Sequence, residues 1–297
     1  KNIKSEVIFV LTQAQAAAYV GGFGFAATDK GLWAMDGGRW ESHGAPLLRT
    51  WSKLAQDAPV GATSVTVENN VSDWYVGGII VVTPTNNPRN GGWQDELRTI
   101  TSINLLPDGK MRLTLDRALA FAHSGTPPMR GEVGLLTRNI VIKTELVGVT
   151  NGEVEGNTRK RLFAHTAFMG TTSKGNIAYT EFKYMGHDNT LGRYTVHPHQ
   201  MADASRSMVI RGNGLWYTGN RWVNIHSSNG ILVEDNVGYQ SANSGYYIEW
   251  DFVTNPPDIP RPVKGVNIDN SFIHNLGVRV EPPPQDGVFP SEFWAAS

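Results

Sequence analysis

The residues best suited to chemistry lie close together, between positions 185 and 199. This stretch holds three of the eight histidines, one aspartate and one arginine: His187, Asp188, Arg193, His197 and His199. Histidine titrates near neutral pH and is a common metal ligand, while arginine can bind a carboxylate through two parallel hydrogen bonds. The stretch therefore has the residue types for proton transfer, metal binding and recognition of an anion.

The composition excludes several other kinds of function. The chain has no cysteine, so disulfides, thiolate chemistry and cysteine-bound zinc are ruled out. Its net charge of −1 provides no basic excess, and we therefore expect no nucleic-acid partner. No run of about 18 apolar residues occurs, so we expect no membrane span. Polar residues interrupt the apolar opening segment, which favours an ordinary strand or helix over a signal peptide.

The hydrophobic pattern predicts a chain made mostly of short strands. Residues 64–67 and 112–115 contain apolar and polar residues in alternation, whereas 78–82 and 138–142 are rich in apolar residues, as in strands buried on both faces. The 32 glycines supply many tight turns. These features indicate an all-β protein with a core large enough for one or two domains.

The second half of the chain carries a weak repeat. Segments around Asn213 and Asn236 align with a spacing of 23 residues, and a third alignment places Asn270 in the same position. A short repeat of strands and Asn/Gly turns is typical of a β-solenoid, in which each coil buries its apolar face against the next. A β-sandwich or jelly roll with chance similarities is the alternative.

The 23-residue spacing also predicts which functional residues share one face. It places His226 and Glu249 on adjacent coils, with His197 or His199 one coil earlier and Asp251 on the same side as Glu249. The expected catalytic set is Arg193, His197, His199, His226 and Glu249. Aromatic and acidic neighbours provide the expected substrate-binding residues Tyr194, Tyr247, Trp250 and Asp251.

Two mechanisms on an anionic sugar polymer fit these residues. In an elimination, a base removes the proton beside the uronate carboxylate, and Arg193 or a divalent cation neutralises that carboxylate. In a hydrolysis, paired carboxylates flank the glycosidic bond that is cut. A metal site could form from His165, His187 and Asp188 together with His197 and His199. An oxygen-rich calcium site near Asp188, Glu249 and Asp251 is the other option, so the expected cofactor is calcium or zinc.

Several ordered motifs resemble a known family. They comprise residues 36–46, 50–54, 74–85, 132–142, 191–199, 220–226 and 234–237. In this order they resemble the domain named for its eight glycines, and the β-helix that follows it, in cell-migration-inducing and transmembrane hyaluronidases and in fibrocystin-like proteins. The resemblance covers roughly residues 20–295.

The resemblance implies a right-handed parallel β-helix with an N-terminal glycine-rich β domain packed against it. It divides the chain into the glycine-rich domain (1–138), the β-helix (139–280) and a tail or further coil (281–297). It also implies a secreted or cell-surface location and a glycan-related activity, of which hyaluronan depolymerisation is the best known. Residues 194–199 and 249–251 depart from the family pattern.

These features lead to one functional hypothesis with two rivals. We expect an extracellular protein that degrades an acidic, uronate-containing polysaccharide by hydrolysis or elimination. The first rival is a glycan-binding module that keeps the scaffold without the chemistry. The second is a structural subunit whose open coil ends stack on further copies, giving a homo-oligomer.

Overall fold

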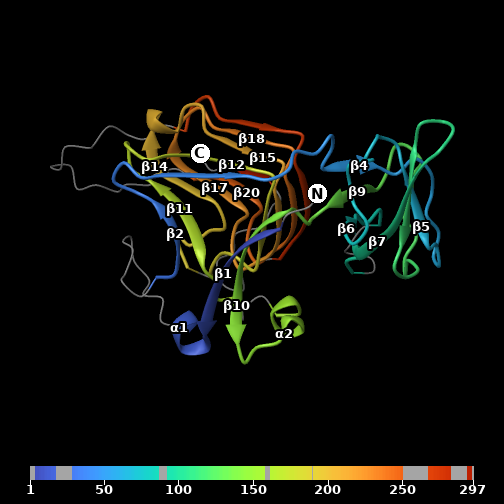
Figure 1. The fold of residues 1–297 in the computed structure, drawn as a ribbon, viewed down its shortest axis with the longest axis horizontal. Helices are drawn as coiled ribbons and strands as arrows, with labels where there is room; N and C mark the ends of the chain where they lie inside the picture. The colour runs from blue at the N-terminus through green and yellow to red at the C-terminus, as the bar shows by residue number, and fades with distance from the viewer. Residues whose placement is uncertain are drawn as a thin grey trace.

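The protein consists of a three-sheet parallel β-helix and a separate antiparallel sheet, which stand side by side in Figure 1. The computed structural model describes residues 4–17, 29–86, 92–157, 161–188, 190–249, 267–281 and 293–295. The predicted all-β class and the parallel β-helix are confirmed. The described helices are short: α1 (Gln13–Ala17), α2 (Asn151–Glu155) and the 3-10 turn η3 (Asp203–Ser205). None of them is long and apolar enough to cross a membrane.

Three parallel sheets form the walls of the β-helix, and each coil adds strands to them. Sheet A contains β1 (Ser5–Thr12), β10 (Ile140–Val147), β13 (Thr180–Lys183), β16 (Gly214–Thr218), β19 (Val237–Ser241) and β22 (Leu276–Val280). Sheet B contains β2 (Gly31–Ala34), β11 (His165–Met169), β14 (His197–Ala202), β17 (Val223–Ser228), β20 (Tyr246–Glu249) and β23 (Phe293–Ala295). Sheet C contains β3 (Arg39–His43), β12 (Lys174–Ala178), β15 (Val209–Arg211), β18 (Leu232–Glu234) and β21 (Ser271–Ile273).

The interior of the β-helix is filled by side chains that alternate inward along the strands. Phe182 and Leu215 of sheet A and Ile225 of sheet B belong to one buried apolar cluster. Because successive residues of a strand point to opposite faces, the residues between them lie on the outer surface of the coil. This alternation is what separates the core from the functional face.

The predicted 23-residue register is confirmed for two coils. Gly214 pairs with Val237, and His226 pairs with Glu249. Buried asparagines reinforce the stack, since the Asn213 side-chain amide donates to Asn236 Oδ1 at 2.8 Å. The third asparagine of this ladder is Asn275, which accepts from Asn236 at 2.8 Å. The predicted position of Asn270 was therefore wrong, because the intervening insertion lengthens that coil to 39 residues.

The antiparallel sheet forms the second body of the molecule. Its order is β4 (Trp51–Lys53), β9 (Glu132–Leu135), β6 (Ile79–Val82), β7 (Glu96–Leu105), β8 (Met111–Leu115) and β5 (Ser64–Val67). It has its own apolar core and packs against the outer face of sheet A. A β-carbon on Gly134 would lie 2.7 Å from Val237 Cγ1, so this glycine permits the close contact.

The division of the chain differs from the expected boundary at residue 138. Strands β1, β2 and β3 lie within residues 1–138, yet they pair with β10, β11 and β12 of the β-helix. The antiparallel sheet is thus an insertion between β3 and β10. The physical reason is edge pairing: eight residues of β1 pair with β10 in unbroken register, which supplies partners to an otherwise open edge. In the expected tail, β23 pairs with β20 and extends sheet B.

Candidate functional site

The outer face of sheet B carries the predicted functional row. On β17, Val223 and Ile225 point into the core, so Asn224 and His226 point outward. The register joins His199 to His226 and His226 to Glu249. Three consecutive coils therefore present His199, His226 and Glu249 in one line, as the repeat predicted.

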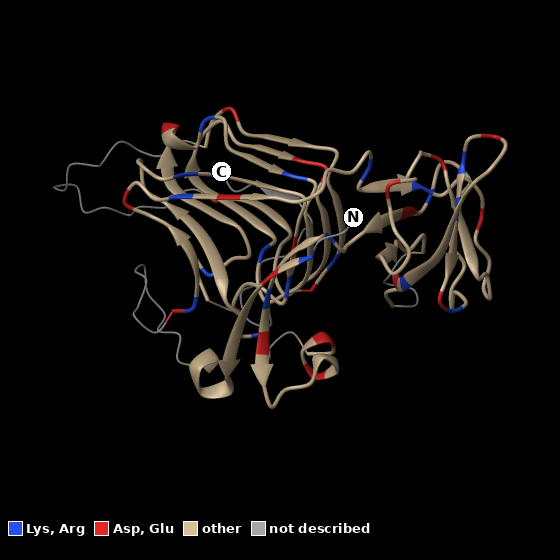
Figure 2. Ribbon diagram, viewed as in Figure 1, with Lys and Arg blue, Asp and Glu red and all other residues tan. Residues whose placement is uncertain are grey.

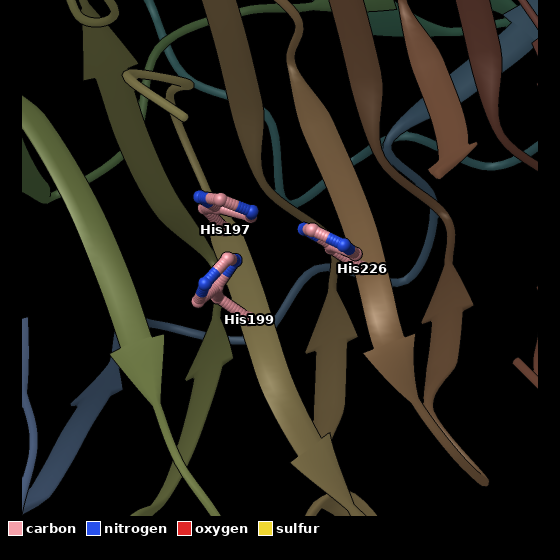
Figure 3. Close-up of side chains that lie close together, drawn as sticks. All are labelled: His197, His199 and His226. Carbon is pink, nitrogen blue, oxygen red and sulfur yellow. The ribbon is translucent and has the colours of Figure 1, made fainter. Parts of the chain in front are cut away.

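Three imidazoles converge at the start of this row. His197 and His199 come from β14 and His226 from β17, and their rings face one another in Figure 3. The ring centroids of His199 and His226 are 4.6 Å apart, and those of His197 and His199 are 4.9 Å apart. One nitrogen from each ring lies within 4.8 Å of the others. This trio, which we call the histidine cluster, has the donor atoms of a metal centre.

The environment of His197 orients its free nitrogen toward the cluster. His197 is buried, and its Nδ1 lies 3.0 Å from the carbonyl oxygen of Gly192. Because a carbonyl can only accept, Nδ1 carries the proton and Nε2 keeps its lone pair. Burial, assisted by the neighbouring His199 and His226, holds the pKa of His197 well below its usual value. Nε2 is buried and has no hydrogen-bond partner among the described residues.

A second group of polar residues adjoins the histidine cluster, and Arg221 is at its centre. The Glu249 carboxylate oxygen Oε2 accepts hydrogen bonds from Arg221 at 3.0 Å, Asn224 at 2.9 Å and the Tyr194 hydroxyl at 3.2 Å. The Arg221 guanidinium also lies 3.5 Å from the centroid of the Tyr247 ring and 4.7 Å from that of Tyr194. These contacts fix a cation between two aromatic rings. We call these five residues the arginine cluster.

The structure changes the role expected for Arg193. Its guanidinium is 2.7 Å from Asp29, and both side chains are buried. The Arg193 side chain is only 3% exposed and cannot reach a uronate carboxylate in this conformation, whereas the half-buried Arg221 lies at the outer face. Tyr194 is also buried rather than presented to a ligand. Its ring edge packs against His197 at 4.7 Å between centroids, so Tyr194 supports both clusters from beneath.

The residues expected to complete a metal site lie elsewhere. His165 Nε2 accepts a hydrogen bond from the Trp33 indole at 3.0 Å, and burial lowers the pKa of His165 to about 3. His187 Nε2 lies 2.8 Å from the Ala16 carbonyl oxygen. Within the described ranges, the metal-capable group consists of the three clustered histidines and includes neither His165, His187 nor Asp188. Local sequence proximity did not predict the group because it is assembled across two coils.

Two expected residues, Trp250 and Asp251, lie outside the described residues, so their predicted roles stay predictions.

Sequence reasoning missed Arg221 and Asn224 as site residues. A signal for Arg221 existed: it follows Tyr194 by 27 residues, the same coil spacing that separates His199 from His226. Aligning the two adjacent coils with this spacing places Arg221 beside Tyr194, provided that the turn before β17 is included in the alignment.

The β-helix of this chain is similar in sequence to a known family. Residues 162–292 match the CEMIP beta-helix family model. The matched range contains both clusters, and the family resemblance seen in the sequence is confirmed. Fibrocystin-L of Mus musculus is 28% identical over 300 residues, covering 88% of this chain and 7% of that protein. The cell surface hyaluronidase CEMIP2 of Homo sapiens is 26% identical over 238 residues, covering 75% of this chain and 16% of that protein.

The chain thus spans a small part of these relatives' length. Among solved structures, the tailspike gp61 of Pseudomonas phage phi297 aligns with a TM-score of 0.29 and 7% identity. That alignment covers 92% of this chain and 47% of the tailspike chain.

Proposed function

We propose that this chain acts on an acidic, uronate-containing polysaccharide at the outer face of sheet B, outside the cytosol or at a cell surface. The observation that carries the proposal is the convergence of the histidine cluster and the arginine cluster on neighbouring coils of that face. The similarity to cell surface hyaluronidases supports both the substrate class and the location.

We propose in addition that the histidine cluster holds a divalent metal of the zinc type. Imidazole nitrogen suits zinc and related ions, whereas calcium prefers six to eight oxygen ligands. His197 carries its ring proton on Nδ1, which donates to the Gly192 carbonyl oxygen, and this leaves the buried Nε2 able to bind a metal, as is typical of metal-binding histidines. Bound there, the metal would supply a Lewis acid for a sugar carboxylate or a water.

The arginine cluster would position the polymer beside the histidines. Tyr247, half-buried and stacked on Arg221, offers a ring against which a sugar can pack. Arg221 would attract a carboxylate, and Glu249 keeps the guanidinium in place through its hydrogen bond. His199 and His226 are half-buried, and either could transfer a proton to or from the substrate.

Incubation with a panel of uronate polymers, with and without a chelator, tests this proposal. Chain cleavage that stops on chelation and returns with zinc is the expected result. Products with an unsaturated uronate end would assign elimination, and new reducing ends without that chromophore would assign hydrolysis. Binding of the polymers without any cleavage would contradict the catalytic proposal and favour the glycan-binding module.

A further inference from the structure

A cavity lies between sheet A and the antiparallel sheet, on a different wall of the β-helix from the histidine row. Its volume is about 520 Å3, within the range of small-molecule sites. Strands β1, β10, β13 and β16 form its floor, and residues 73–79 of the antiparallel domain face them. Lys4 on its wall is 61% exposed, so solvent reaches this part of the cavity. Charges of both signs are mixed along these strands in Figure 2.

Lys183 is the first unusual feature of this cavity. The register aligns it with Lys143 on one side and with Trp216 on the other. Its ammonium lies 4.0 Å from the Trp216 ring centroid and 4.6 Å from that of Tyr184. Within the part of the chain that the structure describes, Lys183 has neither an ion pair nor a hydrogen bond. Burial lowers the pKa of Lys183, and the carboxylates of Glu155 and Glu181, which form no direct ion pair with it, oppose this shift only in part.

Arg138 is the second unusual feature of this cavity. Its guanidinium donates to the carbonyl oxygens of Gly212 at 2.7 Å, Leu135 at 2.8 Å and Thr137 at 2.8 Å. All three acceptors are neutral, and Nη2 is buried with no hydrogen-bond partner among the described residues. Arg138 is 3% exposed, and burial lowers its pKa to about 10. An unpaired donor on a buried cation is costly, which favours an anion as its partner.

The acidic residues of the cavity are engaged elsewhere or face other donors. Glu6 pairs with Lys4 at 2.7 Å. Glu181 accepts from the Arg138 backbone N–H at 3.0 Å and from the Trp216 indole at 3.1 Å, and burial raises its pKa. Asp73 accepts from the Leu48 backbone N–H. Lys143, the remaining cation, pairs with Glu145 at 2.9 Å. Among the described residues that line the cavity, Lys183 and Arg138 are therefore the cations that form no direct ion pair, although Glu181 attracts both at longer range.

We propose that this cavity binds a small ring-bearing carboxylate, of the class of a single sugar acid. The carboxylate would lie between Lys183 and Arg138 Nη2. The ring would pack on the apolar wall formed by Val141, Ile79 and the Tyr75 ring. The site lies on the outer face of sheet A and does not depend on the histidine cluster, so it stands whether or not the chain cleaves a polymer.

Titration calorimetry of the full chain with sodium glucuronate tests the proposal, with glucose and acetate as ring-only and anion-only ligands. We expect saturable glucuronate binding, at least tenfold weaker binding of the other two, and at least a tenfold loss in Lys183→Gln. Lys183→Gln removes a buried unpaired charge, so the fold should stay intact, which thermal unfolding checks. Lys143→Gln should give a smaller loss.

The matched control is Lys110→Gln, a lysine paired with Asp108 in the antiparallel domain, which should bind glucuronate as the parent does. Lys183→Gln should bind zinc as the parent does, which separates this site from the proposed polymer site. Absence of glucuronate binding, equal binding of acetate, or undiminished binding in Lys183→Gln would each overturn the proposal.

Discussion

The outer faces of sheets A and B are built by the same rule but carry different chemistry. On both, every second residue points outward from a continuous apolar interior, and coil pairing brings like positions into line. Sheet A aligns Lys143, Lys183 and Trp216 under the antiparallel domain. Sheet B aligns His199, His226 and Glu249 on neighbouring coils. The coil register thus creates rows of outward side chains, and the residues packed over a row decide what that row can bind.

The two faces also differ in how they treat charge. In the arginine cluster of sheet B, the cation Arg221 is paired with Glu249 and flanked by two rings. In the cavity on sheet A, Lys183 rests on aromatic rings and forms no direct ion pair with a described carboxylate. Because a buried charge without a partner is unfavourable, Arg221 on sheet B is stabilised by Glu249 before any ligand binds, whereas Lys183 on sheet A favours an added anion.

The largest expected effect is on metal affinity. His199→Ala removes one of three nitrogen donors, so zinc affinity should fall by about 100-fold or more. Calorimetry with zinc on the metal-free protein measures this. Lys183→Gln on sheet A is the matched control and should bind zinc normally. Equal affinity in parent and His199→Ala would show that the histidine cluster is not the zinc site.

The next effect concerns the buried ion pair of sheet B. Arg221→Ala leaves Glu249 without its cation, and the side chains are only 12% and 19% exposed. We expect a loss of about 2–4 kcal/mol in the free energy of unfolding, measured by urea denaturation. Arg211→Ala is the control: that arginine is 40% exposed and pairs with Glu234, so about 1 kcal/mol or less is expected. Similar losses in both would mean that burial does not distinguish the pairs.

A smaller effect is expected where the antiparallel sheet meets sheet A. Gly134→Ala would place a β-carbon 2.7 Å from Val237 and 2.9 Å from Leu276, which should cost about 1–3 kcal/mol. Thermal unfolding measures the loss, and glucuronate binding should weaken while zinc binding stays normal. Gly152→Ala in α2 is the control because nothing lies within 4 Å of its added carbon. An unchanged melting temperature in Gly134→Ala would argue against tight docking.

The smallest expected effect is a pH dependence that arises near sheet B. His165 has a folded-state pKa of about 3 because it is buried, so it stays neutral while the unfolded chain takes up a proton below about pH 6.5. Stability is then fully present above pH 6.5 and declines as the pH falls, by about 1.4 kcal/mol for this residue at pH 5.5.

Urea denaturation of the parent and of His165→Gln at pH 7.5 and 5.5 measures this contribution. The variant can still accept the Trp33 hydrogen bond, and its stability should fall less on acidification than that of the parent. Equal declines in both proteins would assign the pH dependence to other groups.

Much of the fold could be predicted because coil stacking leaves a periodic trace. The 23-residue spacing gave the His226–Glu249 pairing, since neighbouring coils must bring apolar positions into line to share a core. Asn275 was missed because an insertion altered the spacing of one coil. The first three strands were placed in the wrong body because their partners in β10, β11 and β12 lie about a hundred or more residues away in the chain.

The site was predicted less completely than the fold. Residue types and periodicity by themselves determined that histidines and Glu249 share a face, because alternation along a strand is a local property. Two features depend on the folded structure. Asp29, which lies 164 residues before Arg193 in the chain, pairs with that arginine in a buried position. Arg221 lies between the rings of Tyr194 and Tyr247. Whether a charge is buried and paired depends on groups brought together by folding, and no local pattern encodes that proximity.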